Sequence, residues 1–151
     1  MSTRTRLLGI DPGKVRLGLA VSDPERRIAS PLATYTRRDL EQDGRYLKTV
    51  IETEVIGQLV IGLPVHLSGQ EGEQAQAARE FGRWLTRLTA LTCIFWDERF
   101  STWEAEASLL AAGLTRKKRL ARRDQVAAQV LLQAYIDAGC PEQIIPGALD
   151  E

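Results

Sequence analysis

The sequence is short of cysteine, of net charge and of long apolar runs, and each shortage excludes a class of protein. Cys93 and Cys140 are the two cysteines in 151 residues, and they form neither a metal-binding spacing nor a disulfide framework, which suits a reducing compartment. Lys and Arg number 20, as do Asp and Glu, so any surface that binds nucleic acid must be a local patch. The apolar run after Arg6 is too short for a signal peptide or a membrane span, so we expect a cytoplasmic protein that does not bind membranes.

The pattern of apolar residues predicts one α/β domain over residues 1–139, followed by a C-terminal tail over 140–151. Strands are expected over 7–10, 17–21, 28–35, 58–63 and 92–96, with Pro31 restricting the third strand to an edge or a break. Helices are expected over 39–54, 71–88, 101–112 and 124–138. Three strands followed by alternating helices and strands indicate an antiparallel meander, then parallel pairing with helices on both sides of the sheet.

The first two strands enclose a turn whose residues suit a site for a metal and a phosphate. Asp11 ends the first strand and Pro12-Gly13 forms the turn, with Lys14 and Arg16 supplying positive charge beside the carboxylate. An ordinary β-turn has a similar composition, so this segment alone leaves both interpretations open.

Three carboxylates fall at the ends of predicted elements: Asp11, Glu98 and Asp124. Functional sites gather at the carboxyl ends of parallel strands, so Asp11 and Glu98 should lie side by side if the first, fourth and last strands are parallel neighbours. A cluster of carboxylates suits Mg²⁺ or Mn²⁺, which prefer oxygen ligands. The alternatives are that Glu98 pairs with Arg99 on the surface, that Asp124 only caps a helix, or that Asp97 serves as a ligand instead.

A run of basic residues comes directly before Asp124. It consists of Arg116, Lys117, Lys118, Arg119, Arg122 and Arg123. Such a cluster can hold a nucleic-acid strand over the carboxylates by binding its phosphates, or it can be a solvated face or a mobile loop. Arg99 can contact the scissile phosphate or simply pair with Glu98.

Four motifs in this order resemble those of the YqgF/RuvX family of ribonuclease H-like proteins, over residues 7–135. They lie at 9–13 with Arg16 and Gly18, at 60–64 with 68–69 and 71–72, at 97–102 with 104–105, and at 124–128 with 131–133. The first motif is weak by itself, whereas the Asp97-Glu98-Arg99 motif in sequence with the other three is specific.

The resemblance implies a ribonuclease H-like mixed sheet of three antiparallel and two parallel strands, with helices on both faces. It also implies an acidic triad of Asp11, Glu98 and Asp124, in which we expect Asp11 to bridge two Mg²⁺ or Mn²⁺ ions and the other two each to hold one. The implied activity is hydrolysis of phosphodiester bonds in precursor 16S ribosomal RNA or in branched DNA. Lys14, Arg16, Arg99 and the basic run would position the backbone, and the protein would be a monomer or a homodimer.

Two other functions remain open at this point. A module of the same fold could bind RNA or DNA in transcription or ribosome maturation without cutting it. The other is a nucleotide phosphotransferase, because the phosphate loop of actin- and hexokinase-like ATPases also begins with an Asp-x-Gly turn between strands. Those folds need two such domains and a second phosphate loop, and 151 residues hold one.

Overall fold

The computed structural model describes residues 4–64, 68–97 and 116–142, in which five strands form one mixed sheet. The strands are β1 (Arg6–Pro12), β2 (Arg16–Ser22), β3 (Ala29–Thr36), β4 (Ile56–Leu63) and β5 (Cys93–Asp97). Their order across the sheet is β3-β2-β1-β4-β5. The three N-terminal strands pair antiparallel, and β4 runs parallel to both β1 and β5, so the predicted mixed sheet is confirmed.

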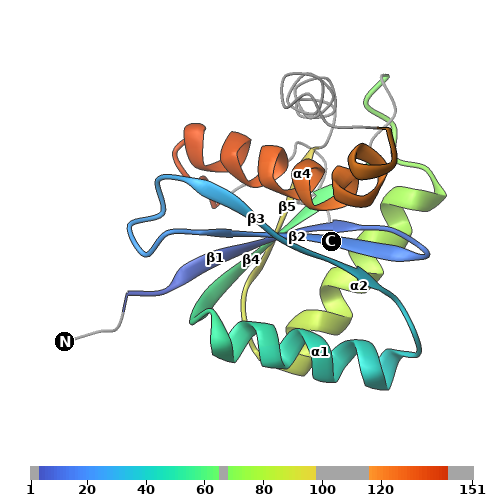
Figure 1. Cartoon of the computed structure of the whole chain (residues 1–151), viewed down its shortest axis with the longest axis horizontal. Coiled ribbons are helices and arrows are strands. Elements are labelled where there is room, and N and C mark those ends of the chain that lie inside the picture. The colour runs from blue at the N-terminus through green and yellow to red at the C-terminus, as the bar shows by residue number, and fades with distance from the viewer. Residues whose placement is uncertain (1–3, 65–67, 98–115, 143–151) are drawn as a thin grey trace.

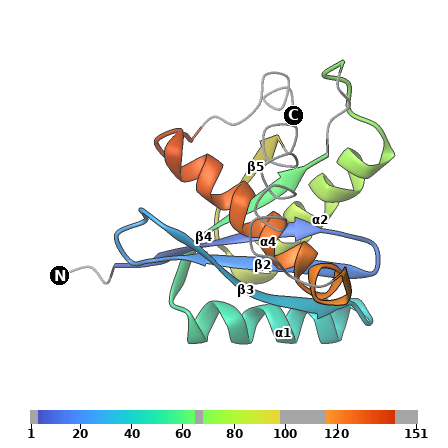
Figure 2. The same cartoon turned by 45° about the horizontal axis from the view of Figure 1, so that its top comes forward.

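Helices cover both faces of the sheet (Figures 1 and 2). Helices α1 (Leu40–Thr53) and α2 (Glu73–Thr89) lie on one face, and α4 (Arg116–Asp137) crosses the other face over the N-terminal strands. The helix expected over 101–112 lies outside the described residues. Within the described ranges, no helix is long and apolar enough to cross a membrane.

The alternation of side chains along the strands divides the core in two. In β1, Leu8 and Ile10 are fully buried against α1 and α2, whereas Leu7 packs toward α4 together with Leu132 and Tyr135. Because successive residues of a strand project to opposite faces, Gly9 and Asp11 share the face of Leu7. The candidate catalytic carboxylate of β1 is thereby directed to the α4 face.

Two local signals in the sequence have the predicted structural effect. The Asp39 carboxylate caps α1 by accepting a hydrogen bond from the Gln42 amide at 2.8 Å. Pro31 lies in β3, which is an edge strand, and the β2–β3 register shifts between the pairs Leu19–Ala33 and Ala20–Pro31. Proline lacks the amide hydrogen that a central strand needs, so it is accommodated at this edge irregularity.

The last helix begins earlier than the sequence predicted. It starts at Arg116, so Asp124 lies inside α4 and the interpretation of Asp124 as a helix cap is wrong. The predicted start placed the basic run outside the helix because its charges hide the apolar periodicity that marks a core-facing helix. The backbone of that run instead forms the first turns of α4.

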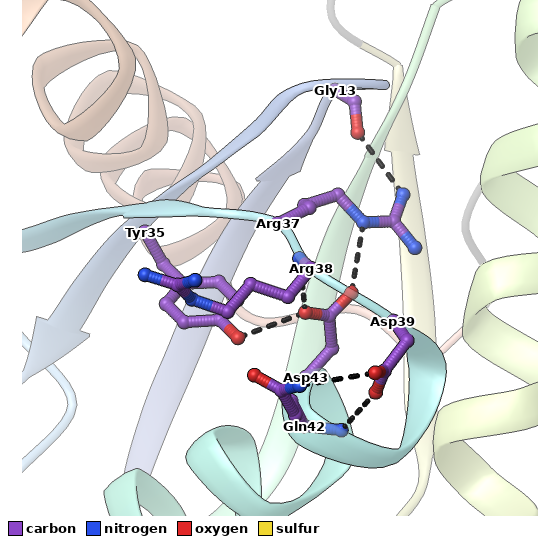
Figure 3. A network of polar contacts seen from close by, with 7 residues as sticks. All are labelled: Gly13, Tyr35, Arg37, Arg38, Asp39, Gln42 and Asp43. Atoms are coloured by element: carbon purple, nitrogen blue, oxygen red, sulfur yellow. Dashed lines mark hydrogen bonds and ion pairs between the residues drawn. The ribbon is translucent and has the colours of Figure 1, made fainter.

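A buried carboxylate joins α1 to the edge of the sheet (Figure 3). Asp43 is 1% exposed and accepts hydrogen bonds from the Tyr35 hydroxyl at 2.8 Å, the Arg38 amide at 2.9 Å and Arg37 Nε at 3.2 Å. Burial alone would raise the pKa of Asp43, but these hydrogen bonds and the positive charge of Arg37 outweigh it and lower the pKa. The carboxylate is therefore ionised at neutral pH.

Replacing Asp43 by alanine should lower the free energy of unfolding by about 3 kcal/mol at pH 7, the lower end of the range for breaking a buried ion pair, because Arg37 is partly exposed. The folded-state pKa is depressed, so this contribution is complete above the unfolded pKa of about 3.9 and is lost as the pH falls through the lower folded value. Urea unfolding of both proteins across that range measures the difference. Glu41→Ala, which removes an exposed ion pair with Arg45 on the same helix, should change stability little at any pH; an equal loss in both variants would contradict the assignment.

Candidate active site

Asp11 lies near the end of β1, directly opposite Gly18 of β2. Residues that face each other across an antiparallel pair project to the same face of the sheet. Gly18 faces α4, since a Cβ added to it would lie 1.9 Å from the carbonyl oxygen of Asp124. The missing side chain thus lets the helix backbone come close to the hairpin that carries Asp11.

Asp124 lies on the sheet-facing side of α4. It precedes the fully buried Ala128 by about one helical turn and Leu132 by about two, and its own side chain is 23% exposed. Gly18 contacts the backbone of Asp124 on one side and faces Asp11 on the other. The fold therefore brings these two carboxylates, distant in the sequence, to the same end of the same face.

Arg16, at the start of β2, pairs with Asp124. Its Nε lies 2.7 Å from Asp124 Oδ2, and its side chain is 54% exposed. An ion pair this exposed contributes at most about 1 kcal/mol, because solvent screens the charges. The sequence predicted that Arg16 binds nucleic acid, and in the structure it pairs with Asp124, the candidate metal ligand. Because the pair is weak, another cation can replace Arg16 beside Asp124, or a phosphate can replace Asp124 beside Arg16, at little cost.

The end of β5 approaches the site from two strands away. The first, fourth and last strands are parallel neighbours, as the sequence argument required, and β4 lies between β1 and β5. The spacing of adjacent strands puts β5 about 10 Å from β1. In β4, Gly62 lies on the α4 face between them and carries no side chain into the gap. Glu98 and Arg99 lie outside the described residues.

Asp97 belongs to the opposite face of the sheet. It pairs with Leu63 in the β4–β5 ladder, and Leu63 packs against Ala75 and Ala78 of α2. Asp97 is 4% exposed. Because it projects toward α2, it does not share the face on which Asp11 and Asp124 meet.

The predicted phosphate-binding residues are distributed around this end of the sheet. Lys14 is exposed in the turn after Asp11, and Arg122 and Arg123 are exposed on α4 beside Asp124. Arg116, Lys117, Lys118 and Arg119 have their backbone in the first turns of α4, and their side chains are not described.

A cavity of about 380 Å³ opens beside Asp11 on the α2 side. Its walls include the turn from Asp11 to Lys14, Arg37, Pro64 and the side of α2 that carries Gln74 and Phe81. Sequence reasoning missed Arg37 and its partner Asp43. The signal was available: Asp43 occupies a helical position in register with Leu47 and Val50, and a carboxylate on a core-facing stripe requires a charged or hydrogen-bonding partner.

The donor atoms at the site fit a hard divalent cation. Asp11 and Asp124 supply carboxylate oxygens, the ligands that Mg²⁺ and Mn²⁺ prefer. Two carboxylates on one side of the β1–β2 hairpin also repel each other unless a cation lies near them, which is the role that Arg16 serves here. Among residues 4–64, 68–97 and 116–142 there is no group of three or more His, Cys, Asp or Glu side chains that could hold a metal ion.

The family model for RuvX, described as "Holliday junction resolvase", matches residues 5–138. The chain belongs to the RuvX family. The match spans every strand and helix described here, including both candidate carboxylates.

Two curated RuvX relatives are similar over most of their length. Both bear the name "Putative pre-16S rRNA nuclease". The protein from Ruegeria pomeroyi is 44% identical over 87% of this chain and 85% of its own, and that from Rhodobacter capsulatus is 46% identical over 87% and 82%.

Solved structures of resolvases share the fold of this RuvX chain. The T. thermophilus RuvC complex with a Holliday junction substrate aligns with a TM-score of 0.59 at 13% identity, covering 93% of this chain and 99% of RuvC. The fowlpox virus resolvase in complex with junction DNA gives 0.57 at 10% identity, covering 91% and 100%.

Replacing Gly18 by alanine should displace the backbone of Asp124, because the new methyl carbon would lie only 1.9 Å from its carbonyl oxygen. Overpacking of this kind typically costs about 1–3 kcal/mol of unfolding free energy. Urea unfolding measures that loss, and NMR shifts of the Asp124 carboxylate report its displacement. Ser30→Ala, on an exposed part of β3, is the control; unchanged stability and unchanged Asp124 shifts in Gly18→Ala would contradict the close packing.

Proposed function

We propose that this chain is a divalent-metal-dependent endonuclease that hydrolyses phosphodiester bonds in structured RNA, with precursor 16S ribosomal RNA as its substrate. The observation that carries the proposal is the convergence of Asp11 and Asp124 at one end of the α4 face, in a chain of the RuvX family. The names of the curated relatives, at 44% and 46% identity, support RNA, whereas the description of the matching family model names a DNA junction; the choice of RNA follows the curated relatives.

In this proposal Asp11, Asp124 and Glu98 hold Mg²⁺ or Mn²⁺. Ions bound there would activate water for attack on phosphorus and stabilise the leaving oxygen, so no side-chain nucleophile is required. Arg16 neutralises the Asp124 carboxylate through its 2.7 Å ion pair, and a metal ion would take over that role. Lys14, Arg122 and Arg123 are exposed cations around the site that bind the phosphate backbone, with Arg99 and the rest of the basic run supplementing them.

Asp11→Asn and Asp124→Asn should each abolish cleavage while leaving the fold intact, because the amide keeps the size of the side chain and removes the negative charge. Loss of about 4 kcal/mol of charge stabilisation corresponds to a rate decrease of about a thousandfold. The assay is cleavage of a labelled precursor 16S RNA in Mg²⁺ and in Mn²⁺, with thermal melting to check folding. Asp137→Asn, at the far end of α4, is the matched control and should cleave normally. Mn²⁺-dependent cleavage at the wild-type rate by both site variants would refute the mechanism.

The same assay, run with a four-way DNA junction beside the RNA, tests the substrate. Cleavage of the junction and not of the RNA would overturn the choice of substrate and leave the metal site in place. Tight binding of RNA without turnover in either metal would instead show a binding module. Light scattering on the enzyme with and without junction DNA measures whether it acts as a monomer or a homodimer, and two-site cutting of a junction requires a dimer.

A further inference from the structure

The cavity beside Asp11 is lined by a positively charged side chain, Arg37, that the proposed mechanism does not use. Arg37 follows β3 and lines the cavity together with Lys14, across from Gln74 and Phe81 of α2. The Arg37 guanidinium lies 5.4 Å from the centre of the Phe81 ring, and its side chain is 23% exposed. The cavity therefore has two positively charged side chains and an aromatic wall, and Asp11 lines it as well.

Arg37 is held in place from behind. Its Nε donates to the buried Asp43 carboxylate at 3.2 Å, and one Nη1 hydrogen is donated to the Gly13 carbonyl at 3.1 Å (Figure 3). Asp43 is fixed in turn by Tyr35 and by the Arg38 amide. The network also ties Arg37 to the turn that follows Asp11, so the guanidinium and that turn keep a constant relative position.

These contacts leave part of the guanidinium available to a ligand. An arginine side chain has five N–H donors, and the two acceptors that Arg37 has among the described residues account for one at Nε and one at Nη1. The guanidinium that carries the remaining donors lies 5.4 Å from the ring of Phe81, which lines the same cavity. Arginine donors in a fixed, partly desolvated orientation bind phosphate with two parallel hydrogen bonds, and little conformational entropy is lost on binding.

We propose that Arg37, with Lys14, forms a phosphate-binding subsite for the nucleic-acid strand on the α2 side of Asp11. This inference rests on the proposed nuclease function and adds the path of the substrate: the strand crosses the carboxyl end of β1, from the α4 face where it is cut to the α2 face where its next phosphate is held. A cavity of about 380 Å³ is within the size range of small-molecule sites and can receive a nucleotide.

Binding measured without cleavage tests the subsite. Fluorescence anisotropy with a labelled precursor 16S RNA fragment, in EDTA and over a series of salt concentrations, gives the affinity and the slope of log K against log salt. Arg37→Gln should weaken binding at least about tenfold, the loss of one charged hydrogen bond, and reduce the slope by about 0.7–0.9, the loss of one phosphate contact. Arg38→Gln removes the same charge one residue away, from a side chain that points away from Arg37 (Figure 3), and should leave the slope unchanged.

A second pair of variants covers the case in which Arg37→Gln does not fold because Asp43 is left buried without its cation. Arg37→Gln/Asp43→Asn removes both charges, and its proper reference is Asp43→Asn alone, from which it differs only at position 37. The double variant should show the lower slope and the reference the wild-type slope, with thermal melting confirming that both fold. Equal slopes in these two proteins, or an equal decrease in Arg38→Gln, would overturn the subsite.

The results separate this inference from the nuclease proposal. If Asp11→Asn still cleaves RNA while the Arg37 variants lose a phosphate contact, the catalytic assignment fails and the subsite stands. If Asp11→Asn is inactive and the Arg37 variants bind normally, the subsite fails alone. If the wild-type protein binds neither the RNA fragment nor a four-way DNA junction, both fail.

Discussion

The close approach of α4 to the β1–β2 hairpin is the constraint on which the site depends. Gly9 and Gly18 lie on the covered face, where added Cβ atoms would come within 2.9 Å of Leu132 Cβ and 1.9 Å of the Asp124 carbonyl oxygen. A side chain at either glycine would push the helix outward. The two glycines therefore set the height at which Asp124 lies above the sheet, and with it the separation of Asp124 from the Asp11 carboxylate. The geometry of the candidate site is therefore set by residues that have no functional group.

Hydrogen bonds from α4 to the sheet fix the position of the helix along its axis. The edge strand β3 leaves backbone groups of Ala29 without a strand partner on its outer side, and two glutamines of α4 bind them: Gln133 accepts from the Ala29 amide at 2.9 Å and Gln129 donates to its carbonyl at 3.2 Å. Nearer the end of the helix, Tyr135 accepts from Gln58 of β4. A slide by one residue would break these contacts and move Asp124 away from Gly18. The helix thus compensates an exposed sheet edge and places a candidate metal ligand through the same contacts.

The sequence predicted the sheet better than it predicted the geometry of the site, for reasons that particular residues illustrate. Strand alternation, the Asp39 cap and the edge position of Pro31 are local signals, and local physics decides them. The predicted start of α4 was wrong because a basic run has no periodic apolar residues. The sequence pattern therefore does not reveal a helix that extends beyond the region packed on the core. The sequence left the spatial order of β1, β4 and β5 as a condition, because chain order does not give spatial order. Asp43 was missed although its position among core-facing residues of α1 was visible, since its partners, Tyr35 and Arg37, become neighbours only when β3 and α1 pack.

Two arginine–aspartate pairs flank Asp11, and their different burial gives them different roles. In the Arg16–Asp124 pair the side chains are 54% and 23% exposed, whereas in the Arg37–Asp43 pair they are 23% and 1% exposed. Water screens the first pair, so its members exchange partners at little cost. Separating the second would leave a carboxylate in the core without its counter-charge, which costs several times more. Arg16 is therefore a replaceable counter-charge for Asp124, whereas Arg37 is a fixed cation. In the proposed nuclease the two pairs would act differently: the charge of Arg16 would yield to metal or phosphate, and the charge of Arg37 would keep its place.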